Sequence, residues 1–147
     1  MDVAQIVRMQ RRHKLRLDAT ECRLNEVGIT DGEMGLVAPV IARMVQLRVL
    51  KLRGNQISDV GVAPLARALA ALKGLTSVDL SGNPITHVGM QHLASSLVGC
   101  ATVQHISMNR VQLDLHATEW KLNNRQLTDA DVAWIVLLLS HGCNLQG

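Results

Sequence analysis

The side chains of this 147-residue sequence that are best suited to chemistry are its six histidines and the serines near them. His87 and His92 are five positions apart near the expected start of a helix, so they lack the i, i+4 spacing of a helical metal pair. His105 and Ser107 could supply a base and a nucleophile, but no third group in neighbouring positions would orient such a pair. The spacing therefore predicts no active site, and we expect a protein that is not an enzyme and uses no cofactor or metal.

The three cysteines give no sign of a disulfide framework or a zinc site. Cys22, Cys100 and Cys143 are odd in number and far apart, and no C-x-x-C pair occurs. We interpret them as small buried apolar side chains in a reducing compartment. The early charged residues leave no room for a secretory h-region, and the longest apolar run, Val132–Leu139, is too short to span a bilayer. These observations predict a cytoplasmic protein with no membrane partner.

The composition argues against disorder and against nucleic-acid binding. Hydrophobic residues make up 48% and charged residues 18%, so a packed core is expected. There is no Phe and no Tyr, which excludes modules that stack bases on surface aromatics. The net charge of +3 comes from residues 1–16, which carry a local +4, whereas the rest of the chain is close to neutral. We therefore expect no nucleic-acid partner.

A regularly spaced repeat organises most of the chain. The pattern Leu47-x-x-Leu50-x-Leu52-x-x-Asn55-x-Ile57 recurs as Leu75-x-x-Val78-x-Leu80-x-x-Asn83-x-Ile85, and more weakly from Val103 to Leu113. The spacing from Leu47 to Leu75 is the same as the spacing from Leu75 to Val103. The second halves also agree, with Gly61 and Gly89 in register. Related units begin at Ala19 and Ala117, which gives about five units in all.

Each half of the unit has a physical interpretation. In L-x-x-L-x-L the last apolar positions alternate, which is typical of a short strand with one buried face. The Gly-Asn pairs at 54–55 and 82–83 suit tight turns. The stretch Asp59–Leu72 then places its apolar residues on one face of a helix. Such units bury their apolar faces only against one another, so the sequence predicts an α/β solenoid with parallel strands.

These residues resemble leucine-rich repeats of the ribonuclease-inhibitor type. The resemblance runs from about Ala19 to the C-terminus and is strongest over Leu47–Leu97. It implies a short segment of a curved horseshoe, with strands on the concave side and helices on the convex side. It also implies a function in binding another protein, as in ribonuclease inhibitor, the Ran GTPase-activating protein, NOD-like receptors and tropomodulin.

Three features depart from the family pattern. The turn asparagine is replaced by Val27, Val111 and Arg125, so an asparagine ladder would be incomplete. The step from Met108 to Leu122 is only half of the repeat period, which is too short for a crossover helix. Finally, residues 17–35 resemble residues 115–133, and an alternating run precedes each copy. We therefore expect extra hairpin strands near residues 14–24 and 111–122, each formed with the repeat strand that follows.

The N-terminal segment is expected to cap the array. Residues 1–13 predict a basic amphipathic helix over the first apolar layer, and residues 14–147 predict the leucine-rich repeat domain. A mitochondrial presequence is a second interpretation, which Asp2 and the lack of serine weaken. A helix on a membrane surface comes third, because its apolar face would be small.

Polar residues between the buried strand positions are expected to line the concave face. A solvated sheet face is polar in any case, so the argument for function rests on charge density. Arg48, Lys51 and Arg53 on one short strand repel one another, and an acidic partner would relieve that repulsion. The candidate protein-binding residues are Arg23, Arg48, Lys51, Arg53, Asp79, His105 and Lys121.

Trp134 is a second kind of candidate. It aligns with Pro64 and His92, at the expected outer surface of the helices, where an exposed tryptophan would be a binding hot spot. The alternative is that it packs beneath the end of the chain. Trp120 occupies a buried strand position and is expected in the core.

The leading functional hypothesis is a non-catalytic protein-protein interaction module or scaffold whose partner has an acidic surface. The alternative is a regulator of a small GTPase resembling the Ran GTPase-activating protein, and only the family resemblance supports it. The apolar run Val132–Leu139 would leave the last helix without a neighbour. The sequence therefore predicts either a fragment of a longer repeat array or self-association through the C-terminal edge of the solenoid.

Overall fold

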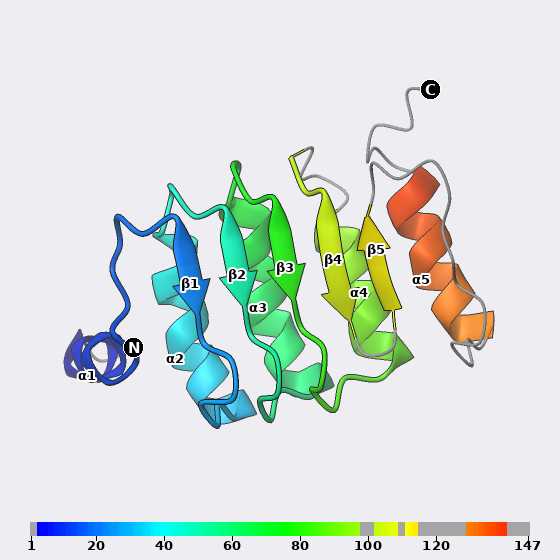
Figure 1. Cartoon of the computed structure of the whole chain (residues 1–147). Helices are drawn as coiled ribbons and strands as arrows, with labels where there is room; N and C mark the ends of the chain where they lie inside the picture. Colours follow the sequence, from blue (N-terminus) through cyan, green and yellow to red (C-terminus); the bar gives the residue numbers. More distant parts are fainter. Residues whose placement is uncertain (1–2, 98–101, 109–110, 115–128, 141–147) are drawn as a thin grey trace.

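The computed structural model describes residues 3–97, 102–108, 111–114 and 129–140. In chain order the elements are α1 (Val3–His13), β1 (Glu21–Arg23), α2 (Asp31–Ala42), β2 (Val49–Lys51), α3 (Asp59–Ala71), β3 (Ser77–Asp79), α4 (His87–Leu97), β4 (His105–Met108), β5 (Val111–Asp114) and α5 (Asp129–Ser140). Figure 1 shows two layers, with the strands side by side in front and helices α2, α3 and α4 behind them. The predicted alternation of strand and helix is confirmed over these repeats.

The sheet follows the order of the sequence. Strands β1 to β4 are parallel neighbours, and β5 is added antiparallel to β4. Each parallel step is one repeat, so Leu50 lies beside Cys22 on one side and Val78 on the other, and Ile106 continues the row. One repeat period in the sequence therefore corresponds to one step from a strand to its neighbour in the sheet. The predicted parallel solenoid is therefore confirmed.

Aliphatic side chains fill the space between the two layers. Leu47, Leu50 and Leu52 are fully buried, and so are Leu75 and Leu80 one repeat later. Complete burial of such a side chain contributes about 1.5–3 kcal/mol relative to leaving it in water. Because every repeat supplies the same small set of side chains, successive layers from β1 to β4 stack on aliphatic residues.

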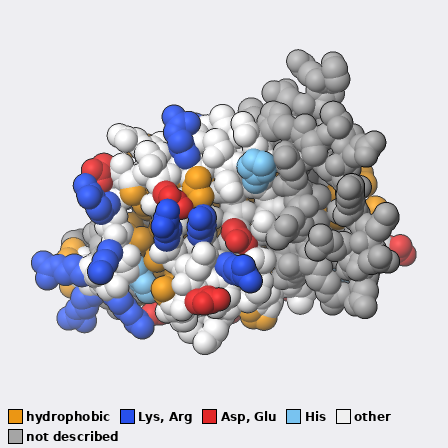
Figure 2. All heavy atoms as spheres, viewed as in Figure 1, with side chains coloured by type: hydrophobic (Ala, Val, Ile, Leu, Met, Phe, Trp, Pro, Cys, Tyr) orange, Lys and Arg blue, Asp and Glu red, His pale blue; other side chains and the backbone are white. Residues whose placement is uncertain are grey.

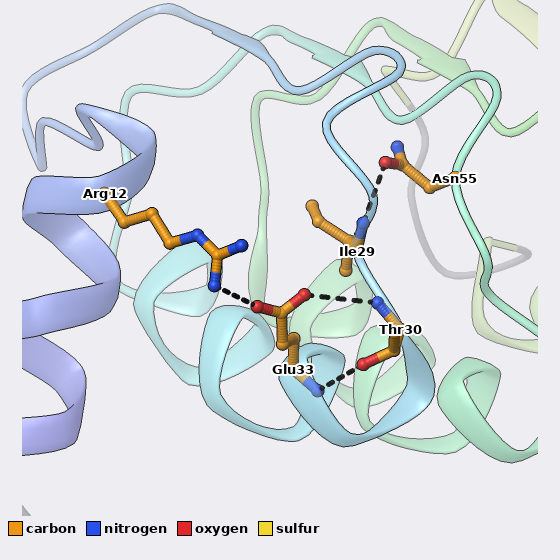
Figure 3. A network of polar contacts seen from close by, with 5 residues as sticks. All are labelled: Arg12, Ile29, Thr30, Glu33 and Asn55. Atoms are coloured by element: carbon orange, nitrogen blue, oxygen red, sulfur yellow. Dashed lines mark hydrogen bonds and ion pairs between the residues drawn. The ribbon is translucent and has the colours of Figure 1, made fainter.

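A ladder of buried asparagines joins the turns of successive repeats. Asn55 is only 5% exposed, and its Oδ1 accepts hydrogen bonds from the backbone N–H groups of Val27 (3.2 Å) and Ile29 (3.1 Å) in the preceding repeat. Its Nδ2 donates to the carbonyl of Leu24 (2.7 Å). Figure 3 shows the bond to Ile29. Asn83 makes the corresponding bonds one repeat later, so the turn at Val27 is held by the asparagine of the next repeat although it has none of its own.

A second ladder, not anticipated from the sequence, links the N-terminal ends of successive helices. Asp31 in the first turn of α2 accepts hydrogen bonds from the backbone N–H groups of Ser58 (2.7 Å) and Gly61 (3.0 Å) at the start of α3. Asp59 does the same at the start of α4, with Gly89 as one of its donors. A carboxylate is favourable there because helix N-termini carry partial positive charge. The sequence signal for this ladder is a Thr-Asp pair that recurs as Ser-Asp one repeat later.

The predicted N-terminal helix is present over residues 3–13 and lies at the β1 end of the array (Figure 1). It packs against α2, and Arg12 Nη1 lies 2.7 Å from Glu33 Oε1. Glu33 also forms a capping box with Thr30 at the start of α2 (Figure 3). The side chain of Arg12 is 64% exposed, so this ion pair orients α1 more than it stabilises it. The division into a cap and a repeat domain stays a prediction.

The expectation of an extra strand is wrong for residues 14–17 and right for residues 111–114. Residues 14–17 form turn and irregular structure rather than a strand. The other segment does form a strand, β5, but it pairs with the preceding repeat strand, β4. β5 closely follows a strand and can fold back on it, whereas residues 14–17 follow a helix and have no adjacent strand to fold back on. The hairpin expected around residues 116–118 and the core position expected for Trp120 lie outside the described residues.

Candidate protein-binding face

The face of the sheet turned away from the helices, called the open sheet face below, is built from the strand residues that flank the buried row. The parallel register brings these residues into two rows across β1 to β4. The first row consists of Glu21, Val49, Ser77 and His105, and the second consists of Arg23, Lys51, Asp79 and Ser107. Within the described strands, the residues expected to line one face are therefore brought together.

Two arginines flank β2, Arg48 directly before it and Arg53 two residues after it. Arg48 and Arg53 are both exposed, and no carboxylate of the described residues pairs with either of them. Figure 2, viewed from this side, shows lysine and arginine side chains concentrated over the half of the molecule that holds α1, β1 and β2. The basic stripe predicted from the sequence is thus a feature of the surface.

One carboxylate, Glu21, lies inside the basic stripe. Its Oε1 is 2.9 Å from Arg23 Nε and 3.2 Å from Lys51 Nζ. The hydrogen bond from Arg23, followed by that from Lys51, lowers the pKa of Glu21 below its usual value. Glu21 thus partly offsets the positive charge of Arg23 and Lys51. The other two cations near β1 and β2 are Arg48 and Arg53. The alternation of buried and exposed strand positions is enough to place Glu21 on this face, but it does not reveal the ion pairs with Arg23 and Lys51.

The remaining predicted residues differ in their availability. Asp79 Oδ1 accepts hydrogen bonds from the backbone N–H (3.0 Å) and hydroxyl (2.6 Å) of Ser81, so this carboxylate is already engaged within its own strand end. His105 is exposed at the start of β4. Lys121 lies outside the described residues. The supported part of the candidate face is therefore centred on β1 and β2.

The prediction that Trp134 is an exposed hot spot is wrong. Its side chain is 1% exposed and belongs to the hydrophobic core. Helix α5 packs against α4 and turns a different face inward, because Val136 is exposed whereas Ala66, the aligned residue of α3, is buried. The alternative, packing beneath the end of the chain, stays a prediction, because residues 141–147 lie outside the described residues.

The described residues show no constellation for catalysis or metal binding. No group of three or more His, Cys, Asp and Glu side chains among them could hold a metal ion. Cys22 is buried, and burial raises the pKa of its thiol to about 12, which makes it a poor nucleophile. In the same part of the chain, no helix has the length and apolar character needed to cross a bilayer.

A pocket near the N-terminus was not predicted. Its volume is 350 Å³, and it lies between residues 13–16 and β1. Three cationic residues line it, Lys14, Arg16 and Arg23, together with His13. The sequence signal was the basic run at residues 11–16, of which 11–13 were expected in the capping helix and 14–16 in an extra strand.

Comparison with known proteins agrees with this architecture. Residues 46–66 and 75–94 match a family model described as Leucine Rich repeat. The solved structure of the leiomodin-1 actin-binding site 2 is similar, with a TM-score of 0.64 and 17% sequence identity over 93% of this chain and 73% of that one. At that identity the likeness concerns the fold. A comparison with curated proteins found no match.

The chain therefore has the fold of a leucine-rich repeat solenoid, and residues 46–66 and 75–94 match the family model itself. Its repeat strands form the open sheet face, and its helices form the opposite layer.

Proposed function

We propose that this chain is a non-catalytic protein-interaction module that binds an acidic partner surface through the open sheet face. The observation that carries the proposal is the charge arrangement at β1 and β2. Arg48 and Arg53 are exposed and have no carboxylate partner among the described residues, while Arg23 and Lys51 share the single carboxylate of Glu21. Four cations against one anion leave a local excess of positive charge.

This arrangement favours association with an anionic surface. Like charges on neighbouring strands repel, and each exposed guanidinium can bind a carboxylate in a bidentate geometry. Charges at an exposed face act mainly on the rate of association and on specificity, and salt weakens both. The short parallel strands hold these side chains in fixed register, so the module is pre-organised for one arrangement of partner carboxylates.

Actin is the first partner to test, because the similar solved structure is named as an actin-binding site. A scaffold role and the ribonuclease-inhibitor subtype belong to the same proposal. The alternative, regulation of a small GTPase, predicts faster GTP turnover when the chain is added to the GTPase. Self-association through the C-terminal edge is a separate prediction, which light scattering tests.

The decisive experiment reverses charge on the open sheet face. A variant carrying Arg48→Glu and Arg53→Glu is expected to lose at least about tenfold in affinity for actin or for a partner first identified by pull-down, which is about 1.4 kcal/mol. Arg67→Glu is the matched control, because Arg67 is exposed on α3, in the opposite layer. Equal affinities for the folded double variant and the control would place the binding site elsewhere.

A further inference from the structure

The outer edge of β1 carries backbone groups that no described residue binds. β1 has β2 as its neighbour on one side and is the first strand of the sheet. Alternate residues of a paired strand direct their N–H and C=O groups toward the same neighbour. Thr20 and Leu24 use theirs toward β2, since Thr20 accepts from Arg48 N–H (2.7 Å) and Leu24 donates to Lys51 (2.8 Å). The N–H and C=O groups of Glu21 and Arg23 therefore point outward.

The 350 Å³ pocket lies along this open edge. Residues 13–16 form one side of it, and Glu21 to Arg23 of β1 form the other. Its volume is at the lower end of the range of about 300–1,000 Å³ that is usual for ligand sites. A single extended segment is the shape that fits between a strand edge and a neighbouring stretch of chain.

The chemistry of the pocket selects an acidic occupant. Lys14, Arg16 and Arg23 line it; Arg16 pairs with Asp18 and Arg23 with Glu21, whereas Lys14 has no ion pair with a described residue. In addition, His13 Nε2 is buried and has no hydrogen-bond partner among the described residues, although buried polar atoms are nearly always paired. A carboxylate entering the pocket would face three cationic side chains and an unsatisfied ring nitrogen.

The chain already completes the other end of its sheet by adding a strand. β5 pairs antiparallel with β4, from Met108 opposite Val111 to His105 opposite Asp114. Residues 14–17 belong to the segment that aligns with β5 in the sequence, but they do not form a strand. The two ends therefore differ, because β4 has the added strand β5 beside it, whereas β1 has no added strand at its outer edge among the described residues.

We propose that an extended acidic segment of a partner protein adds as a strand to the edge of β1. Its backbone would pair with the outward N–H and C=O groups of Glu21 and Arg23, and a carboxylate would lie toward Lys14, Arg16 and His13. This is strand addition to an exposed sheet edge, with main-chain bonds for affinity and side-chain pockets for specificity. The site is distinct from the open sheet face and shares only Arg23 with it. A second copy of this chain fits less well, because it would bring its own Lys14 and Arg16 to the same edge.

A short capped peptide in which Glu and Val alternate is a suitable probe, and the peptide with Lys in place of Glu is its control. Added to the full chain, the Glu peptide is expected to shift the amide signals of Glu21 and Arg23 in NMR spectra and to slow their hydrogen exchange. Two N-methylated peptides are compared, one methylated at its odd-numbered residues and one at its even-numbered residues. Only one of these two phases should abolish binding, because only one edge of the peptide forms hydrogen bonds with β1. This alternation is the signature of strand pairing.

Substitution at Arg23 separates backbone from charge. Arg23→Pro removes one outward N–H, and proline is tolerated on an edge strand when that N–H is not used in the sheet. Arg23→Gln removes the charge and keeps the N–H. We expect the proline variant to bind the Glu peptide at least about tenfold more weakly than the glutamine variant, and the Arg48→Glu, Arg53→Glu variant to bind it as the unchanged chain does.

Four outcomes of the peptide experiments would overturn the proposal. They are absence of binding, equal binding of the Lys peptide, equal sensitivity to both N-methylation phases, and shifts centred on Arg48 and Arg53 instead of β1. A doubling of the protein's mass without peptide, with protection of the same two amides, would assign the edge to a second copy and likewise overturn it. The N-methylated peptides keep the test valid if the proline variant does not fold.

Discussion

Asp31 Oδ1 accepts a hydrogen bond of 2.7 Å from the backbone N–H of Ser58, which lies at the start of the next helix of the solenoid. The side chain that begins α2 therefore caps α3. Asp59 repeats the relationship between α3 and α4. Each repeat thus depends on its predecessor for helix capping as well as for apolar packing.

The Asp31 cap predicts a specific dependence of stability on pH. Desolvation raises the pKa of Asp31, but the hydrogen bonds from the side chain and backbone of Ser58 and from the backbone of Gly61 outweigh it and leave the pKa below its usual value. The folded state therefore holds this proton more weakly than the unfolded state, whose pKa is about 3.9. The stabilisation is fully present above that pH and is lost as the pH falls through the lower folded value.

We therefore expect Asp31→Asn to be less stable than the unchanged chain near pH 6, with the difference shrinking toward about pH 3. Urea unfolding across this range measures it. Asp18→Asn is the matched control, because Asp18 is exposed and pairs with Arg16. A gap between Asp31→Asn and the unchanged chain that does not vary with pH would contradict the role given to Asp31.

Glycine at position 61 is predicted to be required by the same cap. A Cβ there would lie 2.5 Å from Asp31 Oδ1 and 3.1 Å from Ile57 Cγ2, so Gly61→Ala should destabilise the fold by about 1–3 kcal/mol. At Gly35 in α2 a Cβ meets nothing within 4 Å. Gly35→Ala should instead stabilise the helix by about 0.5–1 kcal/mol. Thermal unfolding should show opposite shifts, and shifts of the same sign would refute the prediction.

The asparagine ladder predicts a large effect at Asn55. Asn55→Ala leaves the buried N–H groups of Val27 and Ile29 and the carbonyl of Leu24 without this partner. Each unsatisfied buried group costs about 1–3 kcal/mol, so a loss of at least about 2 kcal/mol is expected in chemical unfolding. Asn25→Ala should lose less, about 0.5–1.5 kcal/mol, because Asn25 is exposed and accepts one backbone hydrogen bond from Arg53.

Trp134 is predicted to affect stability and not binding. Trp134→Ala removes a fully buried side chain and should cost about 3–5 kcal/mol. Val136 on the same helix is 51% exposed, and Val136→Ala should stay within about 0.5 kcal/mol of the unchanged chain. Denaturant midpoints compare the two, and a similar stability for both variants would contradict the buried position of Trp134.

The sequence by itself determined the repeat, the parallel register and most of the open sheet face. In a solenoid of equal units, a fixed offset in sequence is a fixed step in space, so Leu50 lies beside Val78 because both hold the same position in successive repeats. The alternation of buried and exposed positions along each strand then places Arg23 and Lys51 in one row. Local periodicity contains this information, and no long-range packing is needed to obtain it.

The tertiary structure decided the features that depend on contacts between separate elements and on which face of a helix is buried. The ion pair of Glu21 with Lys51 joins residues on different strands and in different rows of the sheet. The sequence pattern of one strand does not reveal such a contact. Trp134 was misplaced because α5 turns a different face inward than α3 does: Val136 is exposed, whereas its counterpart Ala66 is buried. Residues 14–17 were expected to be a strand, but a strand forms only beside another strand with which it can pair. β5 directly follows β4 and pairs with it, whereas residues 14–17 follow the helix α1. The open edge of β1 follows from that same difference.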